Sequence, residues 1–152
     1  MAEFLEPGTL APDFEARNQD GAPVRLRDFR GRSVVLYFYP HDDTVGCTRE
    51  ACAFRDDLQA FRDLGAVILG VSSQDEASHV AFRERYRLPF DLLADPERSI
   101  ASAFRAVAFH GLAKRVTYVI GPDGRILAAY RRLDPKSHSG EALRVLSGVR
   151  HR

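Results

Sequence analysis

The sequence predicts an α/β protein with a mixed central β-sheet flanked by helices. Two stretches, 34–39 (VVLYFY) and 66–72 (AVILGVS), are apolar at nearly every position, as interior strands covered on both faces are. Helix-forming stretches follow both of them along the chain. Near the end, strand-like stretches at 115–120 and 126–131 flank the sequence Gly-Pro-Asp-Gly, which is typical of a hairpin turn. The predicted order, β-α-β-α-β-α-β-β-α, indicates an α/β sandwich with a mixed sheet.

The N-terminal part of the chain predicts a β-hairpin. The segments 11–18 (APDFEARN) and 23–26 (PVRL) are strand-like, and the turn sequence Asn-Gln-Asp-Gly lies between them. Residues 27–31 predict a short helical turn that ends at a glycine. We expect this segment to cover one edge of the sheet.

Four helices are predicted after the hairpin. The first runs from about 46 to 64 and is closed by the glycine that follows it. The second follows the strand at 66–72 and ends before a proline. Its buried side is expected to carry Ala77, Val80, Ala81 and Tyr86. A short strand is then predicted at 90–94, and the last two helices at 99–107 and 140–146.

The composition, with 45% apolar and 28% charged residues, is that of a soluble globular protein. A length of 152 residues is enough for a core, and we expect one domain spanning 1–152. The net charge of +1 gives no reason to expect binding to nucleic acid or to an anionic membrane. The N-terminus carries Glu3 and Glu6 and no apolar run, unlike a signal peptide, and no stretch has the length of a membrane span. Two cysteines five residues apart make no disulfide framework, so we expect a reducing, cytoplasmic setting.

Both cysteines lie in the stretch 39–52 (YPHDDTVGCTREAC), which leads from an apolar strand into the first helix. Cys47 shares one helical face with the apolar residues at 51, 54, 58 and 61, so its side chain is expected in the first turn, pointing towards the protein body. Free amide groups and the helix dipole at this end favour a thiolate and lower the pKa of a cysteine from about 8.5. Asp42 and Asp43 act against the thiolate, so a cation from elsewhere in the chain is needed. The alternative is an inert buried cysteine.

Cys52 cannot pair with Cys47 while the helix between them is intact. Five residues along a helix give a rise of about 7.5 Å and a Cα–Cα distance of about 8.6 Å. A disulfide requires Cα atoms within about 7 Å. Cys52 is expected on the solvent-facing side of the helix, together with Thr48, Arg49, Arg55 and Gln59. A bond between the two cysteines therefore requires the first turns to unwind, although Cys52 can also be read as a surface cysteine without a role.

The run Pro40-x-x-x-Thr44-x-x-Cys47, placed after an apolar strand, resembles the active-site signature of the peroxiredoxins. The second cysteine, five residues later, resembles the bacterioferritin-comigratory or Q branch of that family. The resemblance extends to PGTLAPDF, PFDLLADP and RVTYVIGPDGRI, and so covers most of the chain. It implies a thioredoxin-like fold and a thiol-dependent peroxidase that needs no metal or other cofactor.

The resemblance also implies roles for both cysteines. Cys47 would attack the O–O bond of hydrogen peroxide or an organic hydroperoxide and become a sulfenic acid. Cys52 would resolve it as an intramolecular disulfide, which thioredoxin or a glutaredoxin-like dithiol protein would reduce. The branch is commonly monomeric, so a monomer is expected.

Two further residues of the signature have both a structural and a functional interpretation. Thr44 is a typical helix N-cap, and the resemblance implies that its hydroxyl also hydrogen-bonds the peroxide or the thiolate. Pro40 is a typical end of a strand, and the resemblance implies that it also shields the thiolate from water. The sequence does not separate these interpretations.

Arg115 is the candidate for the missing cation. It opens the predicted strand 115–120, whose counterpart in the family carries an arginine that points into the site, although a solvated strand end is the alternative. A guanidinium keeps its charge and offers several donors in one plane. Together with Thr44 and the amides of Gly46 and Cys47, it would hold the peroxide oxygens. Glu50, one turn after Cys47, is a candidate for orienting it.

Other functions are less well supported by the sequence. A thiol–disulfide oxidoreductase of this fold normally uses Cys-x-x-Cys, which differs from the spacing here. A redox sensor that passes oxidation to a partner protein would use the same sulfenic acid and stays open. A zinc site at His41 and the two cysteines would have an unusual ligand spacing. The chain departs from its branch at Val45, where a proline is usual and a looser loop is expected, and in the short connection 109–113.

Overall fold

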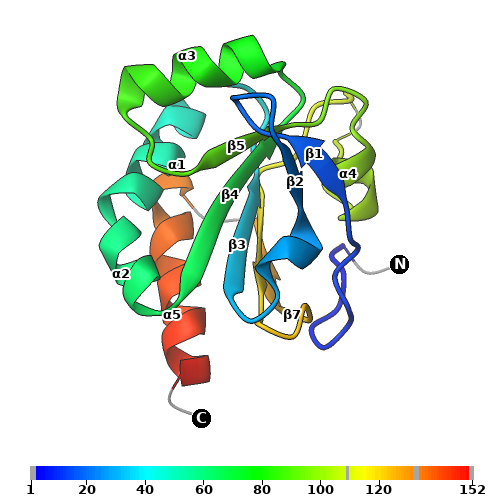
Figure 1. Ribbon diagram of the computed structural model, residues 1–152, viewed down its shortest axis with the longest axis vertical. Helices are drawn as coiled ribbons and strands as arrows, with labels where there is room; N and C mark the ends of the chain where they lie inside the picture. Colours follow the sequence, from blue (N-terminus) through cyan, green and yellow to red (C-terminus); the bar gives the residue numbers. More distant parts are fainter. Residues whose placement is uncertain (1–2, 109, 132–133, 151–152) are drawn as a thin grey trace.

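The computed structural model describes residues 3–108, 110–131 and 134–150. These residues form a mixed β-sheet with the strand order β2-β1-β5-β4-β3-β6-β7 and helices on both of its faces (Figure 1). The strands are β1 (Glu15–Arg17), β2 (Pro23–Arg25), β3 (Ser33–Phe38), β4 (Ala66–Ser72), β5 (Asp91–Ala94), β6 (Val116–Ile120) and β7 (Ile126–Tyr130). The helices are η1 (Leu26–Phe29), α1 (Val45–Asp56), α2 (Leu58–Asp63), α3 (Glu76–Tyr86), α4 (Ser99–Ala103), η2 (Pro135–Ser137) and α5 (His138–Arg150).

The strand β3 is interior, as its apolar sequence predicted. It pairs in parallel with β4 and antiparallel with β6, and all six of its residues are buried. Its side chains alternate between two apolar layers, because successive residues of a strand point to opposite faces. Val35 and Tyr37 pack in the layer under α1, α2, α3 and α5, whereas Leu36 and Phe38 pack in the layer under α4 and the N-terminal segment.

The predicted N-terminal hairpin is confirmed. Strands β1 and β2 pair antiparallel and occupy one edge of the sheet. The link to the rest of the sheet is narrow, since β1 meets β5 through the single pair Arg17↔Ala94. At the opposite edge, β6 and β7 form the hairpin predicted around the Gly-Pro-Asp-Gly turn.

The helix predicted from 46 to 64 is in fact two helices. It is interrupted at Asp57, whose backbone (φ −94°, ψ 6°) ends α1 and precedes α2. The Asp57 carboxylate accepts a hydrogen bond of 2.6 Å from the hydroxyl of Ser139 in α5. The apolar spacing continues through the interruption, which is why the sequence pattern did not reveal it. Gly65 follows with φ +69°, as predicted for a residue that closes a helix.

The predicted buried side of α3 is wrong. Ala77 and Ala81 are exposed, and Val80 and Tyr86 are only partly buried, whereas His79 and Phe82 are the buried residues. The error arises from His79, a polar residue that the apolar pattern left out. Its ring is fully buried because each of its nitrogens has a hydrogen-bonding partner in the protein interior.

Two helix boundaries also differ from the prediction. The helix expected over 99–107 ends at Ala103, and the last helix begins at His138, before the predicted Gly140. The short 3-10 turn η2 immediately precedes α5. His138, the residue that follows this turn, is fully buried. No helix among the described residues is long and apolar enough to cross a membrane.

Candidate active site

Two aspartates in the loop between β3 and α1 form hydrogen bonds with neighbouring elements. The buried Asp42 carboxylate accepts hydrogen bonds from the Tyr39 hydroxyl (2.6 Å), the Ser78 hydroxyl (2.8 Å) and Nδ1 of His79 (2.7 Å). Burial acts to raise the pKa of Asp42, but these hydrogen bonds outweigh it and the pKa is lowered. Asp43, with φ +63°, accepts from Arg85 (2.6 Å) and from the hydroxyl of Tyr86 (2.8 Å), both in α3. The negative charges expected to oppose a thiolate are thus engaged with other groups.

Cys47 lies in the first turn of α1 with its side chain directed inward, as predicted. It is 1% exposed and belongs to the same apolar layer as Ala51 and Phe54. The amide groups of the first helical turn have no intrahelical partner, and the helix dipole is positive at this end. The local environment therefore combines apolar packing with backbone groups that favour negative charge on sulfur.

Arg115 places a positive charge beside Cys47. Its Nη2 lies 3.4 Å from Sγ of Cys47. The residue immediately precedes β6, and the pairing of Val116 with Phe38 brings this strand end beside the end of β3. The side chain is 20% exposed, so it is the part of the cluster that meets solvent. Burial disfavours the charge of Arg115, but the neighbouring Glu50 and Cys47 raise its pKa above the ordinary value.

Glu50 binds the other arm of the same guanidinium. Its side chain is fully buried, and Oε1 accepts a hydrogen bond of 2.8 Å from Nη1 of Arg115. Burial raises the pKa of Glu50 from 4.5 to about 8, although Arg115 acts to lower it. Gly46 leaves room for this arrangement, since a Cβ atom there would lie 2.9 Å from Nη2 of Arg115. Glu50, the residue expected one turn after Cys47, thus lies in direct contact with the guanidinium.

Thr44 occupies the N-cap position of α1, and its carbonyl accepts from the amide of Thr48 (2.8 Å). Its hydroxyl makes no capping bond and donates instead to the carbonyl of His41 (3.1 Å). Among the hydrogen bonds of the described residues, none joins this hydroxyl to Cys47. Pro40 is half-buried and directly follows Tyr39, at the end of the strand.

Cys52 is half-buried, and both cysteines are free thiols. The helix α1 runs from Val45 to Asp56 without interruption, so both thiols lie on one intact helix. The geometry therefore corresponds to the dithiol form of the pair. A disulfide between the two would require the helix to unwind between them.

A sequence profile of the AhpC/TSA family matches residues 7–129. The chain belongs to the AhpC/TSA family. It is 43% identical over 148 residues to the chloroplastic peroxiredoxin Q of Oryza sativa subsp. japonica, a match that covers 95% of this chain and 68% of the relative. It is 40% identical over 153 residues to the peroxiredoxin Bcp of Bacillus subtilis, with 95% and 97% covered.

Solved structures agree with this assignment. The crystal structure of peroxidoxin BcpB from Mycobacterium tuberculosis superposes with a TM-score of 0.89 and 32% identity, covering 95% of this chain and 98% of that one. A Cys-to-Ser variant of Xylella fastidiosa PrxQ superposes with a TM-score of 0.90 and 27% identity, covering 96% and 98%. The expected thioredoxin-like fold is confirmed, and the chain is a thiol-dependent peroxidase of the peroxiredoxin Q or Bcp type.

Two further polar residues of this peroxiredoxin were missed in the sequence. His138, the first residue of α5, is fully buried, and its Nδ1 lies 2.7 Å from Oγ1 of Thr117 in β6 and 3.4 Å from Oε2 of Glu50. Burial and then the charge of Arg115 lower the pKa of His138 to about 4, so the ring is neutral near pH 7. A polar Thr117 inside an apolar strand was the available sequence signal.

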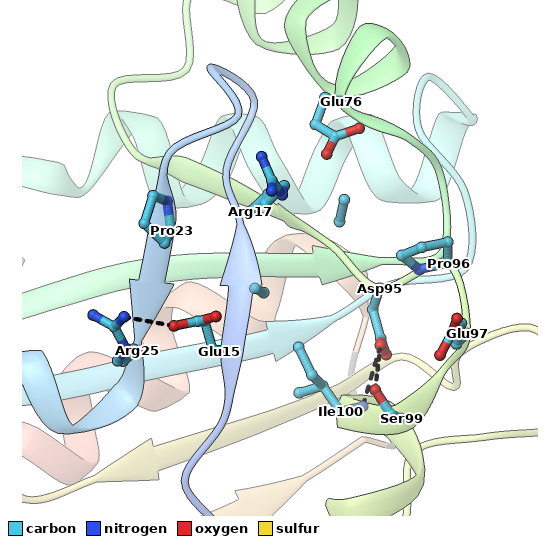
Figure 2. A pocket seen from close by; sticks show the side chains of 12 residues that line it. Glu15, Arg17, Pro23, Arg25, Glu76, Asp95, Pro96, Glu97, Ser99 and Ile100 are labelled. Carbon is cyan, nitrogen blue, oxygen red and sulfur yellow. Dashed lines mark hydrogen bonds and ion pairs between the residues drawn. The ribbon is translucent and has the colours of Figure 1, made fainter.

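The pockets of this peroxiredoxin do not by themselves identify the site. A pocket of about 630 Å³ lies between the β1–β2 hairpin and the starts of α3 and α4 (Figure 2). On one side of the pocket, Arg25 forms an ion pair with Glu15. On another side, the Asp95 carboxylate accepts hydrogen bonds from the backbone amides of Ile100 and Ala101 in α4. Neither cysteine lines it. The buried cluster of Cys47, Arg115 and Glu50 lies elsewhere, under α1.

The loop before Cys47 borders a smaller open groove of about 350 Å³. Its lining includes Val45, Thr48 and Arg49 from α1, and Arg85 and Tyr86 from α3. Val45, the residue that replaces the usual proline, is 71% exposed. It is the first residue of α1, so the helix starts there without a proline.

Two features considered in the sequence remain: a zinc site at His41 and the two cysteines, which was disfavoured, and the short connection 109–113. Within the described residues, no group of three or more His, Cys, Asp and Glu side chains is placed to hold a metal ion. In the connection 109–113, Phe109 lies outside the described residues.

Proposed function

We propose that Cys47 is the nucleophile of this peroxidase and reacts as a thiolate. The thiolate attacks one oxygen of a hydroperoxide, an S–O bond forms, and the O–O bond breaks with both of its electrons passing to the leaving oxygen. That oxygen takes up a proton and departs as water or an alcohol, leaving a Cys47 sulfenic acid. The observation that carries this proposal is the 3.4 Å contact between Sγ of Cys47 and Nη2 of Arg115.

Arg115 is proposed to act on the substrate as well as on the sulfur. Its guanidinium is partly exposed while Cys47 is buried, so an entering peroxide meets the arginine as it reaches the sulfur. Donors in a fixed plane stabilise the charge that develops on the leaving oxygen. The amides of Gly46 and Cys47, free at the helix start, supply further donors for the peroxide oxygens.

Thr44 and Pro40 are proposed to complete the site. The Thr44 hydroxyl now donates to a backbone carbonyl, and its oxygen keeps lone pairs that can accept a hydrogen bond from the peroxide. Pro40 offers no amide hydrogen and stands half-buried at the loop start, where it limits the access of water.

Cys52 is proposed to be the resolving cysteine. After oxidation, the first turns of α1 unwind and the Cys52 thiol displaces water from the sulfenic acid, which forms the Cys47–Cys52 disulfide. A dithiol protein, thioredoxin or a glutaredoxin-like protein, then restores both thiols by exchange. The position of both cysteines on one helix supports a step that is slow until the helix opens.

The substrates are proposed to be hydrogen peroxide and organic hydroperoxides. The bacterioferritin comigratory protein of Xanthomonas campestris, 28% identical over 95% of this chain, is a solved relative described as having alkyl peroxide reduction activity. We further propose that the protein is a monomer in a reducing compartment such as the cytoplasm. Two cysteines five residues apart make no disulfide framework, which supports a reducing setting.

The test uses a Cys52→Ser variant treated with one equivalent of hydrogen peroxide and analysed by mass spectrometry. We expect one added oxygen, on Cys47, because no second thiol is available to condense with it. A Cys47→Ser variant is the matched control and should gain no oxygen at Cys52. Oxygen on another residue, or no reaction at micromolar peroxide, would overturn the assignment. Consumption of many equivalents of peroxide by the wild type with thioredoxin separates a peroxidase from a sensor that reacts once.

A further inference from the structure

A second buried polar layer lies behind the contact between Cys47, Arg115 and Glu50. It consists of Thr117 in β6 and His138 at the start of α5. The hydroxyl of Thr117 and the ring of His138 are joined through a 2.7 Å contact at Nδ1, and both residues are fully buried. The same Nδ1 faces Oε2 of Glu50 at 3.4 Å.

One polar atom of this layer and one of Glu50 have no hydrogen-bonding partner among the described residues. They are Oε2 of Glu50 and Nε2 of His138, and both side chains are fully buried. Buried polar atoms are normally satisfied, and each exception calls for a functional or structural reason. Contacts between catalytic groups are often long in an unliganded enzyme and shorten in the reacting complex. The 3.4 Å distance between Oε2 of Glu50 and Nδ1 of His138 is that of such a long contact.

His138 suits this place because it can serve either protonation state of Glu50. An Nδ1–H group can be shared between Oγ1 of Thr117, at 2.7 Å, and Oε2 of an ionised Glu50, at 3.4 Å. A bare Nδ1 has one lone pair, which accepts from a protonated Glu50 or from the Thr117 hydroxyl. The imidazole is itself neutral near pH 7, since burial and then Arg115 lower its pKa to about 4. It therefore adds a hydrogen-bonding group without adding a charge that would compete with the guanidinium.

We propose that His138 is a positioning residue for the peroxidase reaction: its Nδ1 fixes the second oxygen of Glu50, and thereby holds the guanidinium of Arg115 against the sulfur of Cys47. The inference rests on the proposed function of Cys47. It assigns to the start of α5 a role in aligning the arginine, with Thr117 holding the imidazole in place.

The geometry of the three side chains gives the reason. The terminal torsion of a glutamate is broad, so a carboxyl held by one oxygen can still rotate. Arg115 uses Nη1 for Glu50 and Nη2 for Cys47, and a guanidinium is planar. When the carboxyl rotates, Nη1 follows it and Nη2 leaves the sulfur. Holding Oε2 removes this freedom.

This role has a signature that loss of folding would not produce. Alkylation of Cys47 by iodoacetamide requires the thiolate, whereas the reaction with peroxide also requires a donor aligned with the leaving oxygen. Both rates are measured at a pH where Cys47 is fully ionised in every variant, because moving Arg115 away from the sulfur also disfavours the thiolate. Under that condition, loss of alignment lowers the rate with peroxide much more than the rate with iodoacetamide. General damage to the site lowers both rates together.

The experiment measures both second-order rate constants, with hydrogen peroxide and with iodoacetamide, for the wild type, His138→Leu and His138→Asn, all with Cys52 changed to Ser. For His138→Leu we expect the peroxide rate to fall by about 10-fold or more and the alkylation rate to change by less than about 3-fold, because misplacement of a catalytic group by about 1 Å can cost 10²-fold. The Asn amide places a polar group near the former Nδ1 and should recover most of the peroxide rate. Ser137→Ala, an exposed neighbour, is the matched control and should leave both rates unchanged.

Thr117→Val provides a second variant if the leucine variant fails to fold. It removes only the hydroxyl that holds the imidazole and should show the same split between the two rates, with smaller amplitude. Three results would each overturn the role of His138. The first is an equal peroxide rate in all variants, and the second is a parallel loss of the peroxide and alkylation rates. The third is a peroxide rate that does not recover in His138→Asn. If the Cys52→Ser parent itself fails to react with peroxide, the proposed function of Cys47 is at fault instead.

Discussion

The Arg115 guanidinium lies 3.4 Å from the Cys47 sulfur, although 68 residues separate the two in the chain. The antiparallel pairing of β6 with β3 brings them together, since Val116 lies opposite Phe38 at the end where the chain enters the site loop. The same guanidinium binds the buried Glu50 with its other arm. This three-residue contact leads to three predictions, and a fourth follows from the position of both cysteines on α1.

Changing Arg115 to Lys should lower the rate of reaction with hydrogen peroxide by about 10²-fold, the magnitude typical of losing one preorganised donor to a developing oxyanion. Lysine retains a positive charge but cannot bind Glu50 and the sulfur with two arms of one plane. The rate is measured by stopped-flow or by competition with a peroxidase of known rate. Arg62→Lys, an exposed position in α2, is the matched control. A rate within threefold of wild type would argue against a role for the guanidinium geometry.

Changing Gly46 to Ala should displace the arginine without removing it. The new Cβ would lie 2.9 Å from Nη2 of Arg115, so the guanidinium must move away from the sulfur. We expect the peroxide rate to fall by about 10-fold while the free energy of unfolding changes by less than about 1 kcal/mol, because Ala is the better helix former. Gly148→Ala, a glycine of α5 with nothing within 4 Å of its added Cβ, is the control. If both variants react at the wild-type rate, the close approach at Gly46 has no functional consequence.

Changing Glu50 to Gln should alter how stability depends on pH. Folding raises the pKa of Glu50 from 4.5 to about 8, so over this range the native state keeps a proton that the unfolded state has lost. The free energy of unfolding contributed by this group therefore falls as pH rises from about 4.5 to 8, by up to about 5 kcal/mol. Glutamine cannot titrate, so the variant should gain stability relative to wild type as pH rises.

Urea unfolding at pH 5, 6.5 and 8 measures this difference. Other titrating groups, including Asp42, are common to both proteins and cancel to first order in the comparison. Glu84→Gln, exposed on α3, serves as the control and should give a nearly pH-independent difference. Curves for Glu50→Gln and wild type that run parallel across this range would contradict the assigned burial effect.

The rate of disulfide formation should follow the stability of α1. Arg49 is exposed and lies between the two cysteines on the helix, so Arg49→Gly and Arg49→Ala remove the same side chain and differ in helix propensity by about 1 kcal/mol. We expect the Cys47–Cys52 disulfide to form about 5-fold faster in Arg49→Gly, because its helix unwinds more often. The preceding reaction with peroxide should be similar in both variants. Thiol trapping and mass spectrometry after a single peroxide pulse resolve the two steps, and equal rates of disulfide formation would show that unwinding does not limit the step.

Local sequence patterns were sufficient to predict most of the secondary structure and the position of Cys47 on its helix. The apolar run at 34–39 predicted the interior strand, and the spacing after Cys47 predicted a helix with this thiol in its first turn, facing inward. The tight turns at both hairpins were also predicted from their residues. Arg115 was named only through resemblance to a family, since nothing in its neighbourhood on the chain connects it with Cys47.

The sequence by itself determined where strands and helices form and which end of a helix carries the thiol, because these depend on spacing and on backbone groups a few residues apart. Only the tertiary structure decided which polar side chains are buried. His79 is buried because Asp42 reaches it from another element, and His138 because Thr117 and Glu50 converge on its ring. A polar group tolerates burial only when a partner satisfies it, and partners that come from distant segments leave no periodic pattern in the chain.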